Sequence, residues 1–406
     1  MQNTIEVPVS TKIQSLSRES TRVSVISRLT YIDMVRFILM IMVIMVHAAV
    51  TYGAEGDWTY TDHGANDMLT IVILSLFVII SQSFFMGLFF FFAGYFTPGA
   101  FDRKGVMKFW IDRVVHIAIP MTIYTWFLSR IPNYLDAIAN RGVTQSFWQF
   151  SSRTMFSQAD GGPTWFLLAL LVFSLGYTLI RLSAKGLALN TDSKLNNLPA
   201  PKTSTLLWVS AVLAVVMFII AQSRSIDQPV KGFNIFTLMV AFFPFYIVLF
   251  VGGILAYRND WLTKMPSTML RFWGWLSLGS IVFLPIFLLG TGAVDLGLDL
   301  YLRGLNWRCA LTSAWFGLSG IAFSTTMTLW MRDHVKPGNR VAKAVGPNTF
   351  GIYLIHPVVL VPITFLMTGS AIHPMIKFAI ASVSTIVLCF VITEVLRRIP
   401  IVKKTM

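Results

Sequence analysis

Three ionisable side chains, Asp33, Arg36 and His47, stand out in residues 31–52, a run long and apolar enough to cross a bilayer as one helix. Ionisable groups inside a membrane span are costly, so they indicate a functional site by default. Arg36 and His47 are eleven residues apart. At about 100° per residue this places both on one helix face, roughly 16 Å apart along the axis. A cation and an imidazole on one face predict a site that holds an anion and performs proton chemistry.

Each of these side chains also has a purely structural interpretation. Arg36 is near a helix end, where an arginine can extend its head group to the membrane interface. His47 is deep in the span and would be able to hydrogen-bond to a neighbouring helix. Asp33 precedes Arg36 by three residues, which is close enough for an ion pair. The face shared by Arg36 and His47 favours the functional interpretation for both.

The composition predicts an all-α polytopic membrane protein. Hydrophobic residues make up 55% of the 406 residues and charged residues only 12%, about half the charged fraction of a soluble protein. The net charge of +14 does not indicate nucleic acid, because the basic residues lie in short loops between apolar runs. The two cysteines and six histidines show no ligand spacing, so we expect no metal site. We also expect no permanently bound cofactor.

About ten apolar runs of span length follow one another along the chain. Of the 32 Lys and Arg residues, 23 fall in segments on the side of the N-terminal tail and seven on the other side. This bias predicts a multi-pass protein of the cell (inner or cytoplasmic) membrane with both termini in the cytoplasm. We expect cytoplasmic tails over 1–31 and 397–406 and a membrane domain over 32–396. The expected spans are 32–52, 70–96, 114–131, 164–182, 205–222, 235–257, 272–290, 309–331, 346–368 and 375–396.

A basic segment follows the second span on the tail side. Residues 97–113 carry Arg103, Lys104 and Arg113, and His116 follows at the start of the third span. Such a cluster can hold a polyanionic head group such as a nucleotide phosphate. Attraction to anionic lipid is at least as common an explanation.

Aromatic and imidazole side chains occur near the starts of two later spans. Trp165 opens span 164–182, where a tryptophan suits the outer membrane interface. Tyr353 and His356 are three residues apart in span 346–368 and share a face, beside Pro357, which frees a backbone carbonyl. These residues can line the same cavity as His47, but a kinked packing helix explains the second pair equally well.

Three other stretches bear on how the spans are arranged. Gly87 and Gly94, in the Phe-rich end of span 70–96, leave room for close helix contact or for a local break. The outer loop 130–163 combines amide and aromatic side chains, which suit a sugar-like acceptor and equally an interfacial belt. The tail-side loop 182–204 is polar and is expected to be a flexible link.

Four patches of the chain form a recognisable ordered set: IDMVRFILMIMVIMVHA, FFMGLFFFFAGYFTPGAFDRKGVMKFWIDRVVHIAIP, GPTWFLLALLVF and NTFGIYLIHPVVLV. In this order they resemble acyltransferase family 3, the integral membrane acyltransferases that modify cell-surface carbohydrates and related acceptors. Within that family the chain looks most like the branch containing the periplasmic-glucan succinyltransferases. It departs from the family's pattern at Ala93, where many relatives have Ser, and at His116, where Arg is common.

The resemblance implies transfer of an acetyl or succinyl group from acyl-CoA on the cytoplasmic side to a hydroxyl of a cell-envelope carbohydrate. His47 would act as general base, which requires a neutral imidazole. Arg36, oriented by Asp33, would bind the donor or stabilise charge at the thioester. Residues that bind the donor or support it would be Arg103, Lys104, Arg113 and His116, and residues of the cavity or acceptor site would be Trp165, Tyr353 and His356.

A secondary transporter of a small anionic or polar solute is the main alternative. Transporters also have about ten spans and ionisable residues at the membrane midplane, but they commonly show internal repeats with interrupted helices in matching positions. No such repeat is evident, and the face shared by Arg36 and His47 occurs once. A non-catalytic scaffold would leave His47 and His356 without a role. No Ser or Cys nucleophile stands beside His47, so we expect direct transfer.

Overall fold

The computed structural model describes residues 9–62, 67–155, 157, 159–186, 197–400 and 402. This part of the chain is almost entirely helical, and its sheet is one antiparallel hairpin of β1 (Val230–Gly232) and β2 (Phe236–Leu238). Eight of its segments are long and apolar enough to cross a membrane. The all-α polytopic class predicted from composition is therefore confirmed.

Each expected span corresponds to helical structure. The segment Met68–Arg141 contains two of them, 70–96 and 114–131. Helix α15 (Trp307–His334) matches 309–331, although its many Ser, Thr and Gly residues make it less apolar than the other spanning helices. The remaining spans are α1 (Val9–Thr51), α7 (Trp165–Gly186), α9 (Thr203–Ser223), α10 (Phe243–Asn259), α12 (Thr268–Gly290), α17 (Thr349–Leu366) and α18 (Pro374–Leu396).

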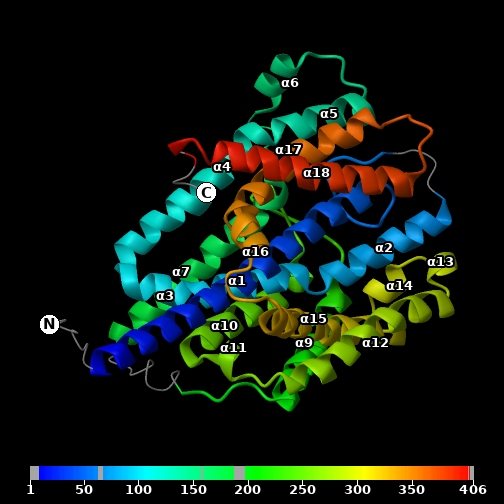
Figure 1. Cartoon of the computed structure of the whole chain (residues 1–406). Coiled ribbons are helices and arrows are strands. Elements are labelled where there is room, and N and C mark those ends of the chain that lie inside the picture. Colours follow the sequence, from blue (N-terminus) through cyan, green and yellow to red (C-terminus); the bar gives the residue numbers. More distant parts are fainter. Residues whose placement is uncertain are drawn as a thin grey trace.

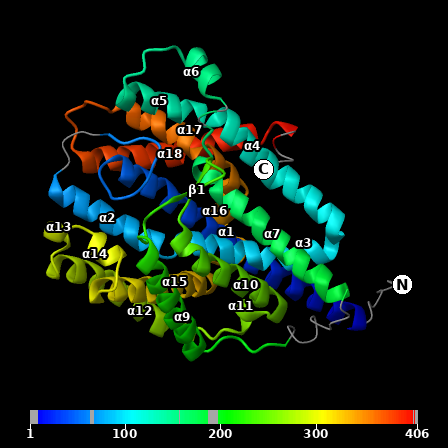
Figure 2. The same ribbon diagram turned by 180° about the vertical axis from the view of Figure 1, so that it is seen from behind.

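Helix α1 runs through the middle of the bundle, where it contacts α15, α17, α18 and α2 (Met68–Gln82) (Figure 1). The first turn of α1 and the last turn of α18 lie at one end of the bundle, on the left in Figure 1. Helices α13 (Ala293–Leu296) and α14 (Asp299–Leu302) lie at the opposite end, and the view from behind shows the same division (Figure 2). We call these two ends the tail side and the outer side.

Two segments expected to be loops contain helices. On the tail side, α3 (Phe85–Arg113) continues through 97–113 and turns a corner at Gly105, whose φ of 71° is accessible to glycine at no steric cost. On the outer side, the expected loop 130–163 contains α5 (Arg130–Arg141) and α6 (Phe147–Thr154), which is started by a Ser146–Gln149 capping box. Helix α5 lies alongside α17 in both views (Figures 1 and 2).

Two other expectations need revision. The span expected at 235–257 begins with β2, and its helix α10 starts only at Phe243, next to Pro244, a residue suited to a helix start. Helix α7 continues to Gly186, so it takes up part of the segment 182–204 expected to be a flexible link. Most of the remainder of that segment lies outside the described residues.

Helices α3 and α10 make the most extensive helix–helix contact of the described chain, and glycines allow it. A Cβ atom on Gly94 would lie 2.0 Å from the carbonyl oxygen of Phe250, and one on Gly253 would lie 2.0 Å from that of Phe91. The ring of Phe245 occupies the corresponding space at Gly87. The close helix contact expected at Gly87 and Gly94 is therefore present.

We expect Gly253→Ala to destabilise the protein by about 1–3 kcal/mol, because the added methyl group would overlap the backbone of α3. Gly252→Ala is the matched control, since its methyl group would lie 3.9 Å from the Phe91 ring, an ordinary contact distance. Thermal unfolding of the two variants in the same detergent compares them directly. Equal melting temperatures would contradict the packing described here.

Candidate active site

A cavity of about 520 Å³ lies against the outer half of α1. Residues Val43, Val46, His47 and Val50 line it from α1, spaced three or four apart as one helix face requires. Other segments complete the wall: the loop after α1, the ends of α2 and α3 on either side of the Ser83–Phe84 break, the β1–β2 hairpin, α14, α15 and α17. A helix break at membrane depth is tolerated where it is buried in protein, as Ser83 and Phe84 are.

The imidazole of His47 belongs to a group of three nearly parallel rings. Its centroid lies 3.7 Å from that of Trp58, with 17° between the ring planes, and 5.3 Å from that of His356, with 9° between the planes. Trp58 and His47 line the cavity, whereas His356 is completely buried. The two imidazoles of spans 32–52 and 346–368 are thus brought together.

Pro357, the first of two prolines in α17, accounts for how His356 is held. Pro357 has no N–H group, so the carbonyl of Tyr353, four residues earlier, lacks its usual helical partner. The Nδ1 atom of His356 lies 2.6 Å from this carbonyl oxygen. A carbonyl can only accept, so Nδ1 carries the hydrogen in this contact. The sequence Tyr-x-x-His-Pro therefore fixes the imidazole through its own backbone.

Tyr353 and Trp165 form another part of the cavity wall. The hydroxyl of Tyr353 donates to the carbonyl oxygen of Pro163, which ties α17 to the turn that begins α7. The Trp165 ring lies nearly parallel to that of Tyr246, 5.9 Å away. Of the residues expected at the cavity, Trp165 and Tyr353 line it and His356 lies behind it.

The loop between α1 and α2 places Trp58 over His47. Its backbone is attached to α1 by the Asp62 N–H, which donates to the Thr51 carbonyl over 2.9 Å, and by the Thr51 hydroxyl, which donates to the Tyr60 carbonyl over 3.2 Å. The Asp62 carboxylate accepts from the Lys377 ammonium of α18 over 2.9 Å. Both side chains of this ion pair are only 5% exposed. The loop is therefore anchored at both the first and the last spanning helix.

We expect removal of one charge of the Asp62–Lys377 pair, in Lys377→Met or Asp62→Asn, to cost about 3–5 kcal/mol of stability, because the other charge stays buried without its ion partner. The double variant should be less destabilised than the sum of the two single variants. Melting temperatures of the four proteins measure this coupling. Additive single effects would show that the pair does not anchor the loop.

The mouth of the cavity is predominantly acidic. Among the described lining residues, Lys231 is the one lysine or arginine, against four carboxylates. Burial raises the pKa of the Tyr60 phenol, so this side chain at the base of the loop stays neutral and acts as a hydrogen-bonding group. The lining carboxylates are Glu55, Asp57, Asp160 and Asp227.

Arg36 lies on the tail side of α1 and does not line the outer cavity. Its Nη1 atom is 3.8 Å from an Asp33 carboxylate oxygen, so the expected ion pair is present. The side chain is about one-third exposed. Between Arg36 and the deepest cavity residue on α1, Val43, the same helix face carries Met40, which is buried.

The basic residues expected to bind the donor surround the corner of α3. Lys104 pairs with Asp112 across Gly105, and Arg113 donates to the Thr97 hydroxyl over 3.2 Å. His116 Nδ1 contacts the Asp112 carbonyl oxygen. Arg103 is exposed. Within the described part of the chain, none of these four residues forms a hydrogen bond or ion pair with Arg36, so they form a separate basic surface.

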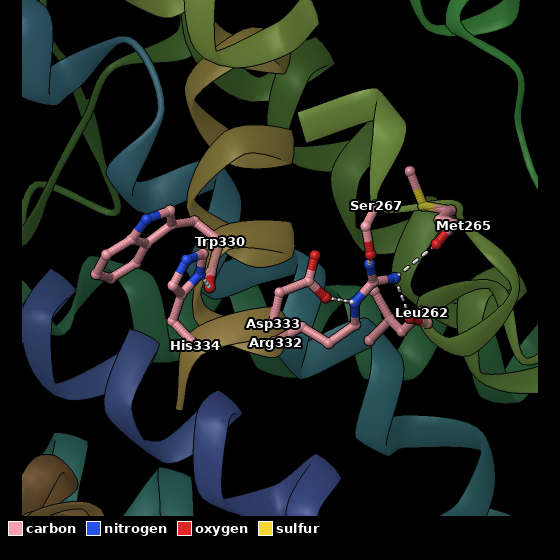
Figure 3. Close-up of polar contacts among 7 residues, drawn as sticks. All are labelled: Leu262, Met265, Ser267, Trp330, Arg332, Asp333 and His334. Atoms are coloured by element: carbon pink, nitrogen blue, oxygen red, sulfur yellow. Dashed lines mark hydrogen bonds and ion pairs between the residues drawn. The ribbon is translucent and has the colours of Figure 1, made fainter. Parts of the chain in front are cut away.

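Another tail-side arginine has a structural role. Arg332, near the end of α15, donates to the carbonyl oxygens of Leu262 and Met265 over 2.9 and 2.7 Å and contacts Asp333 over 2.7 Å (Figure 3). It thereby joins α15 to the segment between α10 and α12. In the same view the ring of His334 stacks on Trp330, with the centroids 4.8 Å apart.

Sequence reasoning missed Trp58 and the Asp62–Lys377 pair. Trp58 lies in an irregular loop, where no periodicity indicates the direction of a side chain. Lys377 carried a usable signal, because a lysine inside an apolar span needs a buried partner. The acid-rich loop 53–69 on the same side of the membrane was the place to seek that partner.

Comparison with known proteins defines the class of this chain. A family model described as an acyltransferase domain matches residues 29–394. The chain belongs to this family, acyltransferase family 3, and is an integral membrane acyltransferase.

Relatives of known name align with nearly the whole chain. The chain is 25% identical over 394 residues to the glucans biosynthesis protein C of Escherichia coli O81 (strain ED1a). It is 24% identical to the proteins of the same name from Escherichia coli O6:K15:H31 (strain 536 / UPEC) and strain K12. Each alignment covers 92% of both chains. No solved structure matches the chain.

Proposed function

We propose that the protein transfers a short acyl group, acetyl or succinyl, from acyl-CoA at the tail side to a carbohydrate hydroxyl in the outer cavity. One observation carries this proposal: a single helix presents Arg36 at the tail side and His47 in a cavity bordered by exposed outer loops. In the proposed topology both tails, 1–31 and 397–406, are cytoplasmic. Acyl-CoA then binds from the cytoplasm and the acceptor binds at the opposite face.

The cavity suits a neutral polyhydroxyl acceptor. Its volume of about 520 Å³ is within the usual range for small-molecule sites. Its wall combines apolar side chains with the Trp165 ring, and its acidic mouth can accept hydrogen bonds from hydroxyl groups while repelling anions. Relatives named glucans biosynthesis protein C support a glucan or similar cell-envelope carbohydrate.

The residues around His47 support direct transfer. The imidazole removes the proton of an acceptor hydroxyl as the oxygen attacks the thioester carbonyl carbon. The new O–C bond forms, the C–S bond breaks, and the CoA thiolate leaves and takes up the proton. No Cys lies among the lining residues, and the two described cysteines are buried elsewhere.

Arg36 is assigned to donor binding. Its separation from His47 along the helix, roughly 16 Å, exceeds the reach of one side chain, so Arg36 does not contact a thioester held at His47. A phosphate or the amide-rich arm of the donor is its expected partner. Met40 lies on the same helix face between them and is buried. A donor that reaches from Arg36 to His47 must therefore displace the Met40 side chain, which its flexible thioether chain permits.

The test is acyl-CoA turnover by the purified protein. Release of free CoA is followed with acetyl-CoA and succinyl-CoA, in the presence of a neutral oligoglucan or cell-envelope extract. Acceptor-dependent release with ester formation on the sugar is expected. Absence of CoA chemistry with either donor, together with substrate-dependent uptake into vesicles, would favour the transporter alternative.

A further inference from the structure

The two aromatic neighbours of His47 lie in different directions. The centroid separations of 3.7 Å to Trp58, 5.3 Å to His356 and 6.2 Å between those two rings place them almost at a right angle as seen from His47. A nearly parallel ring only 3.7 Å away must be stacked face to face, so Trp58 covers one face of the imidazole. His356, nearly parallel but displaced sideways, therefore lies beside the edge of the His47 ring.

His356 has one ring nitrogen left that can accept a hydrogen bond. Its Nδ1 atom carries the hydrogen that it donates to the Tyr353 carbonyl, so in the neutral ring Nε2 holds a lone pair. This Nε2 atom is buried and has no hydrogen-bond partner among the described residues. A buried polar atom without a partner is costly and uncommon. An N–H group on the facing edge of His47 would satisfy it.

We propose that Trp58 and His356 are positioning residues: Trp58 fixes the plane of the His47 ring, and Nε2 of His356 accepts a hydrogen bond from one His47 nitrogen. The other His47 nitrogen is then unprotonated and faces the cavity as the base. This inference rests on the proposed function and deepens it. Catalytic hydrogen bonds are often long without substrate and tighten when it binds. The acceptor proton moves from oxygen to the free His47 nitrogen and then to the CoA sulfur.

Substitutions at His356 test whether its Nε2 atom accepts a hydrogen bond from His47. His356→Phe keeps a flat ring without an acceptor and should lower kcat by about 100-fold, because the base loses its fixed tautomer and orientation. His356→Gln places an amide oxygen near the Nε2 position and should recover part of this loss. The KM values for both substrates should change less than about twofold if only transition-state interactions are lost. An unchanged kcat in His356→Phe, or a rise in the KM for the carbohydrate alone, would overturn the positioning role of His356.

Substitutions at Trp58 test the stacking. Trp58→Phe keeps a ring over His47, whereas Trp58→Ala does not. The alanine variant should lose about 10-fold or more in kcat, and the phenylalanine variant should recover part of this loss. If Trp58 instead binds the sugar, Trp58→Ala will raise acceptor KM and leave kcat unchanged, which excludes the positioning role.

A readout independent of activity separates this inference from the proposed function. Hydrogen exchange at the C2 carbon of each histidine, followed by mass spectrometry, reports ring exposure. We expect the C2 hydrogen of His47 to exchange roughly several-fold faster in Trp58→Ala, because loss of the indole leaves one face of the imidazole uncovered. Trp330→Ala is the matched control, because His334 ends α15, whereas the α15 residues that line the cavity, Thr312 and Phe316, lie near the start of the helix. It should accelerate exchange at His334 and leave His47 unchanged.

The outcomes are distinguishable. If the wild type transfers no acyl group but His47 exchange responds to Trp58→Ala, the proposed function fails and the ring packing stands. If acyl transfer is present but neither kcat nor His47 exchange responds to Trp58→Ala, the positioning role fails alone. If Trp330→Ala accelerated exchange at His47 as much as Trp58→Ala does, this would also contradict the positioning role of Trp58.

Discussion

Replacing His47 by alanine is expected to lower kcat for acyl transfer by about 10²- to 10⁴-fold, the usual contribution of a general base. The affinity for acyl-CoA should change little, because Arg36, assigned to donor binding, lies at the other end of the helix. Initial rates of CoA release give kcat, and calorimetric titration gives the donor affinity. The expected pattern is loss of chemistry with retention of binding.

His334→Ala is the control for this prediction. His334 is another ring-stacked histidine of the described chain, but it lies at the tail-side end of α15, outside the cavity lining. Its substitution should leave kcat within about twofold of wild type, as for a surface change. A His47→Ala enzyme that retains most of its rate would remove the general-base role, whatever the effect of His334→Ala.

Arg36→Ala is expected to raise the KM for acyl-CoA by about 10- to 100-fold, the loss of a charge-assisted hydrogen bond. The kcat at saturating donor should fall much less, because Arg36 is too far along α1 to touch a thioester at His47. Arg36→Lys should be intermediate, since lysine keeps the charge but not the planar fork of donors. Steady-state kinetics with acyl-CoA varied at fixed acceptor measure both constants.

Arg340→Ala, at the start of α16 (Arg340–Val345), is the matched control because Arg340 is an exposed tail-side arginine. Its KM for acyl-CoA should equal that of the wild type. A large fall in kcat with unchanged KM in Arg36→Ala would instead place Arg36 at the reacting thioester. That outcome would require α1 to bring the donor carbonyl close to Arg36 and far from His47.

The helices were predictable because membrane thickness imposes a length on every span. The positions of His47, Tyr353 and His356 also followed from local pattern, since residues three, four or eleven apart share a helix face. The glycine contacts at Gly94 were predictable for the same kind of reason: a missing side chain inside an apolar helix usually has a packing cause.

Long-range partners were not predictable from local pattern. The Asp62–Lys377 pair joins residues 315 positions apart, and Trp58 reaches His47 through an irregular loop. The helical corner of α3 depends on the positive φ of Gly105, and it turns an expected phosphate-binding loop into a surface where Lys104 is paired with Asp112. Such arrangements are set by tertiary packing, which the periodicity and hydropathy of a sequence do not predict.

The central claim is that donor and acceptor meet from opposite faces along α1. Proteoliposomes with the protein in one orientation, established by protease access to the N-terminal segment, test this most directly. Acyl-CoA is supplied either inside or outside, with a neutral oligoglucan in the other compartment. We predict acylated glucan only when acyl-CoA is on the face where α1 begins. Equal acylation with acyl-CoA on either face, or acylation only from the outer face, would contradict the account.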